Sequence, residues 1–592
     1  MKANKILNPT FILLALSTGL LLWFIIAFIV LPNAEVLVTT FFQDGSLSLE
    51  AIHKITSSER AVQALKNSFL IAITLPILTS LVGILQVLFI EYFEIKGSKF
   101  LFITYLIPLV FGGLLINNGY LFVYGSNGIV TNILLNFFPN LDPAWFTGYG
   151  AVMLVMTFGC TTNYMIFFRN ALRQIDFYSI EAAKNLGASQ FTVLKDVVLP
   201  QLRPIISTCI ILLFQQGLGA MAAPLIVGGE DFESISPLIL ILANRSNSRD
   251  LAAILALILG FTQIVLLFVM QRNEKKGHYL SISKTKAKFT KQQINNQFVK
   301  VVSHIFAYVF SIIHLLPFVA VILFSFTDYQ TIASGQLTLS SFTLSNYARI
   351  IFDPDAYSPL MTSIVYAGLS SLVVAIVTIF VARMIHKYNN KFTTMIEYLL
   401  HIPWLLPAIL FSLGLVITYG SPKLLVFNQI LTGTWIIMLI AYIVVMLPNT
   451  LRFTKAAFFS VDQNLEEAAA NLGASKFYTF FKIVLPFIIP TSLALFALNF
   501  NGKLADYDLS AFLYHPLNPT LGIVIRSNAD PTAAIDAEAL NLVYSVILIA
   551  INAFVVWLVY FEGFGKITRI MRKLRGKGET KAVIDMNQVQ SQ

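Results

Sequence analysis

Long apolar stretches recur along this chain of 592 residues and decide what it can fold into. A helix needs about 20 apolar residues to cross the hydrocarbon core of a bilayer. Inside a bilayer every backbone N–H and C=O needs a partner within the protein, so apolar segments of this length form helices. The sequence therefore predicts an all-α, multi-span membrane protein, with twelve spans near residues 11–31, 67–90, 100–124, 148–168, 203–227, 251–270, 301–325, 361–385, 397–418, 433–451, 489–513 and 540–560.

The composition excludes an ordinary soluble protein. Charged residues make up 12% of the chain, whereas soluble domains carry about 25%. The first apolar stretch is longer than the core of a signal peptide, which is about 7–15 residues, and we expect it to be a retained span. The two cysteines, Cys160 and Cys209, lie in apolar segments and form no metal or redox motif.

The twelve stretches form two sets of six that repeat each other. Ser68 corresponds to Ser363, and Pro108 corresponds to Pro403, in both cases 295 residues further along the chain. Repeats with an even number of spans have the same orientation in the membrane, unlike the inverted repeats of many secondary transporters. The sequence therefore predicts two tandem six-span halves in parallel orientation.

The clearest repeat is a stretch of 24 residues between the fourth and fifth spans of each half. Residues 181–204 read EAAKNLGASQFTVLKDVVLPQLRP and residues 467–490 read EAAANLGASKFYTFFKIVLPFIIP, with 13 identical positions. Each copy predicts a short helix, a break and a second helix. Short polar side chains cap helix starts, and glycine suits the left-handed residue after a helix end. The residues with these roles are Asp176 and Asp462, Gly187 and Gly473, and Ser189 and Ser475.

This stretch resembles the EAA loop of ABC-importer permeases, whose pattern is Glu-Ala-Ala, three residues, Gly, nine residues, then Ile-x-Leu-Pro. Both copies meet the spacing, and Val197 replaces the isoleucine in the first. In that family the loop is a coupling helix that docks into a cleft on a separate ATPase subunit. The resemblance implies an ATPase-coupling role in EAA loops 176–204 and 462–490 for Glu181, Ala182, Ala183, Gly187, Glu467, Ala468, Ala469 and Gly473.

The distribution of lysine and arginine predicts the orientation, because these residues are enriched on the cytoplasmic side. With the N-terminus inside, the inner segments carry 31 of the 40 basic residues and the outer segments carry eight. Both EAA loops, residues 272–300 and the tail 566–592 then face the cytoplasm. The basic segment 272–300 links the halves, and it is either a solvated linker that enforces topology or a contact for anionic lipids.

No catalytic constellation is present in the sequence. There is no GxxxxGK[ST] phosphate-binding loop, and the seven histidines are scattered, with none at metal-ligand or nucleophile spacing. We therefore expect a chain that is not an enzyme and holds no cofactor, with ATP and Mg²⁺ on a partner ATPase. Whether any metal binds is left open, and no nucleic-acid partner is expected.

Polar residues inside spans are costly and usually face a cavity or a partner. The eleventh span holds the clearest cluster, and Lys503 and Asp506 are three residues apart, so their side chains can pair. Either this pair is a structural tie or it lines the path of a charged solute. The candidate path residues are Gln215, Gln216, Asn499, Asn501, Lys503, Asp506 and Asp508.

The resemblance implies a fused permease of the type I ABC-importer fold, with domains at residues 1–271 and 301–565. It implies two copies of an ATPase subunit, an extracytoplasmic binding protein, alternating access and a place in the bacterial inner membrane. Leu509-Ser510-Ala511 resembles ferric-iron permeases, although residues 217–220 lack the acid often found there. Phosphonates, sugar phosphates and polyamines stay as alternative solutes, and a secondary transporter is the alternative of another class.

Overall fold

The computed structural model describes residues 9–560, apart from 277–290 and short gaps at 44–45, 48–49, 112, 174, 176, 230–231, 246–247, 335–336, 462, 531 and 535. The predicted tail, much of the predicted basic linker and the two predicted aspartate caps, Asp176 and Asp462, lie outside the described residues.

The first half is helical, with short π-helical segments (η2 to η4) and a two-stranded antiparallel ribbon. Its elements are α1 (Pro9–Ile25), η2 (Ile26–Val30), α2 (Leu31–Phe41), β1 (Phe42–Gln43), β2 (Ser46–Leu47), α3 (Glu50–Ser57), α4 (Glu59–Val87), η3 (Leu88–Tyr92), α5 (Ser98–Tyr105), α6 (Ile107–Val110), α7 (Leu114–Tyr124), α8 (Ile129–Phe137), α9 (Gly148–Leu172), α10 (Phe177–Asn185), α11 (Gln190–Thr192), η4 (Val193–Val198), α12 (Leu199–Leu218), α13 (Ala222–Val227), α14 (Ile235–Ala243) and α15 (Arg249–Lys276).

The second half repeats this order without a ribbon in its described part. Its elements are α16 (Gln297–Phe324), α17 (Tyr329–Ser334), η6 (Leu339–Ser341), α18 (Ser345–Phe352), α19 (Pro354–Tyr388), α20 (Lys391–Leu405), α21 (Ala408–Tyr419), η7 (Leu424–Val426), α22 (Trp435–Phe459), α23 (Gln463–Asn471), α24 (Lys476–Thr479), η8 (Phe480–Val484), α25 (Leu485–Leu504), α26 (Ser510–Leu513), α27 (Leu521–Asn528) and α28 (Ala537–Tyr560). The segments η6 and η7 are 3₁₀ turns and η8 is π-helical.

Each predicted span has a counterpart in the structure, and the described residues form an all-α membrane fold. Ten helices are long and apolar enough to cross a bilayer, and two further pairs of helices become spans if each bent pair counts as one. The bent pairs are the third and ninth spans, which turn by 114° after α6 and by 101° after α20. These two spans are therefore broken, where the sequence predicts continuous segments.

Local backbone preferences explain both breaks. Gly113 lies at the first break with φ of +62° and ψ of −134°, a region that side chains with a Cβ avoid. At the second break Leu406 is extended, with ψ of 142°, because the ring of Pro407 disfavours a helical residue before it. Each break turns the chain sharply inside the membrane domain.

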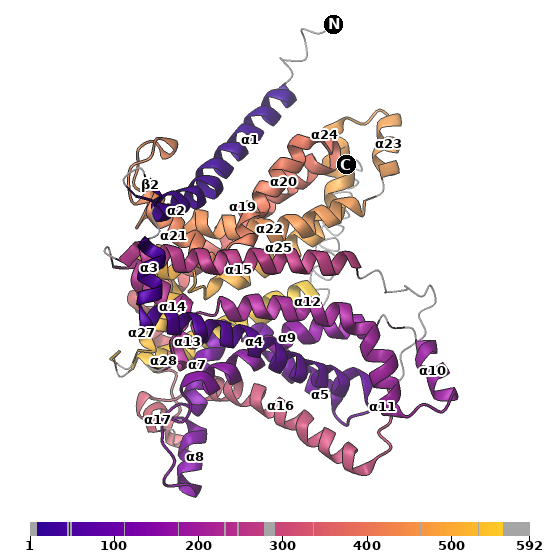
Figure 1. Cartoon of the computed structure of the whole chain (residues 1–592), viewed down its shortest axis with the longest axis vertical. Coiled ribbons are helices and arrows are strands. Elements are labelled where there is room, and N and C mark those ends of the chain that lie inside the picture. Colours follow the sequence, from indigo (N-terminus) through magenta and orange to yellow (C-terminus); the bar gives the residue numbers. More distant parts are fainter. Residues whose placement is uncertain are drawn as a thin grey trace, which may run out of the picture.

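The first span of each half packs on the opposite half (Figure 1). Helix α2 lies against α21, and the Tyr419 hydroxyl donates to the carbonyl of Ala27. In the other direction α16 lies against α5 and α7, where the Tyr105 hydroxyl donates to the Ala307 carbonyl at 2.8 Å. Each half therefore completes the apolar core of the other.

Candidate coupling loops and translocation path

The two EAA loops fold into similar helical hairpins at the same end of the molecule, where α10 and α23 lie at the right of Figure 1. Gly187 has φ of +84° and Gly473 has φ of +82°. The N–H of Ala188 donates to the carbonyl of Ala183 at 3.0 Å, and Ala474 does the same to Ala469 at 3.0 Å. These bonds close the Schellman motif expected when glycine follows a helix end.

Serine starts the second helix of each hairpin, as predicted. The Ser189 hydroxyl accepts from the backbone N–H of Thr192 at 3.1 Å, and the Ser475 hydroxyl accepts from the N–H of Tyr478 at 3.2 Å. Such a cap satisfies a backbone donor that has no partner within its own helix. The prediction of helix, left-handed glycine and capped helix is confirmed in both copies.

The tips of the hairpins expose large apolar side chains. Leu186 and Leu472, which precede the two glycines, are each 88% exposed. Phe191 and Phe477 are 72% and 69% exposed at equivalent positions of the following helices. Glu181, Ala182, Glu467 and Ala468 are exposed beside them, whereas Ala183 is half-buried and Ala469 is buried. Exposed apolar residues gathered in this way mark a surface that contacts a partner.

A central cavity of about 370 Å³ lies where the ends of the fifth and eleventh spans meet. Helices α9, α12 and α25 and the first turn of α7 contribute to its wall. Its polar lining residues include Asn117, Asn163, Gln216, Tyr507 and both predicted aspartates, and small residues line the rest, among them Gly113, Gly159, Gly219, Gly502 and Ala505. Pockets with a few polar groups set among small and apolar residues are the usual form of ligand sites.

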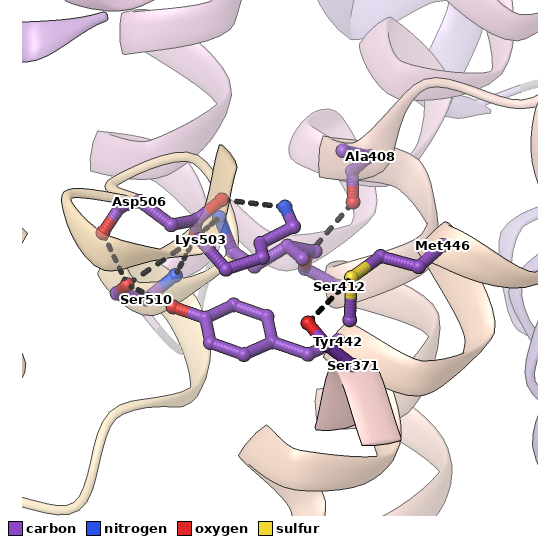
Figure 2. Close-up of polar contacts among 9 residues, drawn as sticks. Ser371, Ala408, Ser412, Tyr442, Met446, Lys503, Asp506 and Ser510 are labelled. Atoms are coloured by element: carbon purple, nitrogen blue, oxygen red, sulfur yellow. Dashed lines mark hydrogen bonds and ion pairs between the residues drawn. The ribbon is translucent and has the colours of Figure 1, made fainter. Parts of the chain in front are cut away.

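The predicted pair in the eleventh span forms, although the helix ends earlier than predicted. Helix α25 ends at Leu504, so Asp506 lies in the following turn. Lys503 Nζ donates to Asp506 Oδ1 at 2.7 Å and lies 5.1 Å from the ring centroid of Tyr442. The other carboxylate oxygen of Asp506 accepts from the backbone N–H groups of Leu509 and Ser510 at 3.2 and 3.3 Å (Figure 2). Both oxygens of Asp506 are therefore bonded.

Asp508 differs from Asp506 in its surroundings. It lines the cavity and is exposed, and it makes no hydrogen bond or ion pair with another residue in the described part of the chain. Since Lys503 compensates Asp506, the carboxylate of Asp508 leaves a net negative charge at the cavity wall. Gln216 also lines the cavity and is exposed.

The cavity lining does not include the other predicted path residues, Gln215, Asn499, Asn501 and Lys503. Asn499 donates to the hydroxyl of Thr450 on α22 at 2.9 Å, and Asn501 donates to the carbonyl of Asn552 on α28 at 3.4 Å. Both asparagines therefore join α25 to neighbouring spans. The structure adds Asn117 and Asn163 to the cavity lining. Their signal in the sequence was an amide inside an apolar span, which is weaker than a charge.

Comparison with known proteins identifies the family. The family model described as "Binding-protein-dependent transport system inner membrane component" matches the chain twice, at residues 98–275 and 375–561. The chain belongs to this family. It is a fused permease of the ABC-importer type, a multi-pass membrane subunit that is not itself an enzyme.

The relatives of the permease include both general and solute-specific names. An ABC transporter permease protein, y4fN of Sinorhizobium fredii, is 34% identical over 90% of this chain and 94% of its own length. The ferric transport system permease protein FbpB of Actinobacillus pleuropneumoniae is 21% identical over 94% of this chain and 80% of its own. The sulfate transport system permease protein CysT of Escherichia coli is 23% identical over 30% of this chain and 66% of its own.

Proposed function

We propose that this permease forms the membrane path of an ATP-driven importer, with both EAA loops docked on ATPase subunits. The main support for this proposal is the pair of matching hairpins at one end of the molecule, each of which exposes a leucine beside a left-handed glycine. Two equivalent hairpins fit two copies of one ATPase, which would hold ATP and Mg²⁺. A binding protein would deliver the solute at the opposite end, outside the bacterial inner membrane, and both termini would face the cytoplasm.

In the proposed mechanism ATP closes the ATPase pair and draws the two hairpins together. Each hairpin runs directly into a span that reaches the central cavity, α12 from the first and α25 from the second. Movement of the hairpins would therefore open or close the cavity from opposite sides. Alternating access of this kind exposes one site in turn to each side of the membrane, through rocking of one bundle against another.

For the solute we favour a cation, specifically ferric iron. The support is the uncompensated carboxylate of Asp508 at the cavity wall, together with relatives named as ferric transport permeases at 21% and 22% identity. Relatives named for 2-aminoethylphosphonate and sulfate keep anionic solutes as the second candidate. Lys503 gives little support for an anionic solute, because its ammonium group is already paired with Asp506.

The test is uptake into proteoliposomes that contain the permease, its ATPase and its binding protein. We expect ATP-dependent accumulation of ferric iron, with no accumulation driven by an ion gradient when the permease is reconstituted alone. Accumulation of 2-aminoethylphosphonate or sulfate in place of iron would contradict the proposed cationic solute but would still support the ATP-driven importer. Gradient-driven uptake by the permease alone would reject the importer mechanism.

A further inference from the structure

The two coupling helices differ at several positions, and one of these is buried in the first half. The residue before the EAA glutamate is Ile180 in the first half and Glu466 in the second. Ile180 is fully buried in the apolar core of the first half, together with Leu88 at the end of its second span. In the second half the residue equivalent to Leu88 is Arg383, on the eighth span. Two buried apolar positions in one half are thus occupied by two opposite charges in the other.

These two charges form a bidentate ion pair. Arg383 Nη1 donates to Glu466 Oε1 at 2.5 Å, and Nη2 donates to Oε2 at 2.6 Å. The side chains are 18% and 26% exposed, and the Arg383 guanidinium carbon lies 5.6 Å from the ring centroid of Phe480. Two parallel bonds between planar groups fix direction as well as distance. The pair therefore holds α23 in one orientation against α19.

Helix α19 connects this pair to the rest of the path. It runs for 35 residues, which at about 1.5 Å per residue exceeds the thickness of a bilayer core. It packs along α22 and α25, the helices that carry Tyr442 and Lys503. A movement of α23 that is passed to α19 thus reaches the elements beside the cavity.

We infer that Arg383 and Glu466 form a latch that positions the second coupling helix and transmits its movement to the eighth span, while the equivalent residues of the first half, Ile180 and Leu88, are packed in the apolar core. This inference rests on the proposed importer function. The latch makes the two halves unequal: an ionic contact is directional and breaks over a short distance, whereas apolar packing tolerates sliding. Arg383 and Glu466 are positioning residues, because neither lines the cavity.

The main test measures solute imported per ATP hydrolysed in proteoliposomes, together with thermal stability and co-purification of the ATPase. For Glu466→Gln we expect co-purification to persist and import per ATP to fall at least about fivefold, since one charge-assisted pair is lost. The exchanged pair Arg383→Glu with Glu466→Arg should recover most of the loss. Lys455→Gln is the matched control, because Lys455 pairs with Glu397 at 2.5 Å, at similar exposure, between α22 and α20. It should leave import per ATP unchanged.

A second variant transplants the first-half arrangement. Arg383→Leu with Glu466→Ile should restore thermal stability but not coupling, because an apolar pair packs without fixing direction. Unchanged import per ATP in Glu466→Gln, or full coupling in the transplanted variant, would overturn the latch. If Glu466→Gln fails to fold, import per ATP in the Arg383→Leu, Glu466→Ile variant still tests the latch. Wild-type proteoliposomes without ATP-driven uptake would instead overturn the proposed function, so the two failures are distinguishable.

Discussion

Lys503 and Asp506 form an ion pair of 2.7 Å across the end of a membrane helix, with 15% and 6% of their side chains exposed. The lysine belongs to the last turn of α25 and the aspartate to the turn that follows. Asp506 also accepts from the backbone of Leu509 and Ser510, so the pair joins the end of the eleventh span to the start of α26. The pair shapes one wall of the cavity, and its two charges compensate each other.

Lys503→Met should destabilise the permease by about 1–3 kcal/mol, because it leaves a mostly buried carboxylate without its charged partner, bonded only to two backbone N–H groups and the Ser510 hydroxyl. Asp506→Asn in the same chain should recover the stability, since the amide oxygen still accepts from the backbone donors. Asp506→Leu should not, because it leaves those N–H groups unpaired. Thermal unfolding of the three variants in detergent measures this. Recovery by leucine equal to that by asparagine would show that the backbone bonds contribute nothing.

Asp508→Asn should reduce uptake of a cation by about tenfold or more, because it removes the uncompensated charge at the cavity wall. Thermal stability should not change, since Asp508 has no hydrogen-bond partner among the described residues. Uptake in proteoliposomes measures the effect, and Asp530→Asn, at a partly exposed bend outside the cavity lining, serves as control for uptake. Faster uptake of an anion by the variant would assign the opposite charge to the solute.

Gly473→Val should impair coupling while the membrane domain stays folded. A Cβ at Gly473 would meet no atom within 4 Å, so the effect comes only from the left-handed backbone, which costs about 1–2 kcal/mol for a residue with a side chain. Gly187→Val should act in the same way. The control is Gly19→Val, where the space is equally open and the helix has ordinary dihedrals. Uptake and ATPase co-purification are measured, and normal uptake with both loops substituted would contradict the coupling role.

The latch should depend on pH. The hydrogen bonds from Arg383 hold the pKa of Glu466 below its usual range, against the opposing effect of burial, and the charges of Arg383, His386 and Lys387 add to the lowering. A lowered pKa stabilises the folded state above the unfolded pKa of glutamate, about 4.3, and this stability is lost as pH falls through the folded pKa. The melting temperature of the wild type should therefore exceed that of Glu466→Gln at pH 7 and converge with it in acid. A constant difference down to pH 3 would contradict this.

The proposed orientation is tested by labelling single cysteines with an impermeant thiol reagent in intact cells. In a background with Cys160 and Cys209 replaced by alanine, Ser475→Cys should stay unlabelled and Ser334→Cys should react. Figure 1 shows α17, which ends at Ser334, at the opposite end from α23. Labelling of the Ser475→Cys variant from outside would reverse the proposed orientation.

Local sequence rules predicted much of this fold. Hydropathy located all twelve spans, because ten are apolar helices that satisfy their own backbone hydrogen bonds and two are bent pairs of apolar helices. The left-handed turns at Gly187 and Gly473 and the caps at Ser189 and Ser475 followed from residue type alone. The bend before Pro407 was readable in principle, but it lay inside an apolar run that hydropathy scores as one span.

Contacts between distant residues could not be predicted. Nothing local in Tyr419 indicates that its hydroxyl bonds Ala27, 392 residues away. The same limit applies to the cavity: Asn163 looks like any amide in an apolar helix until α9 is placed beside α12. Charge drew attention to the eleventh span, and the amides near it, Asn499 and Asn501, turned out to join helices.

The exchange of first spans between halves has a consequence for biosynthesis. Helix α2 leaves the ribosome long before its partner α21, which begins more than 360 residues after α2 ends. Meanwhile the surface of α5 and α7 that α16 will cover faces lipid or the insertion machinery. The nascent first half therefore lacks part of its helix packing until the second half has been made. Fusing both halves in one polypeptide ensures that the missing helix arrives in the same membrane, in equal number and in fixed order.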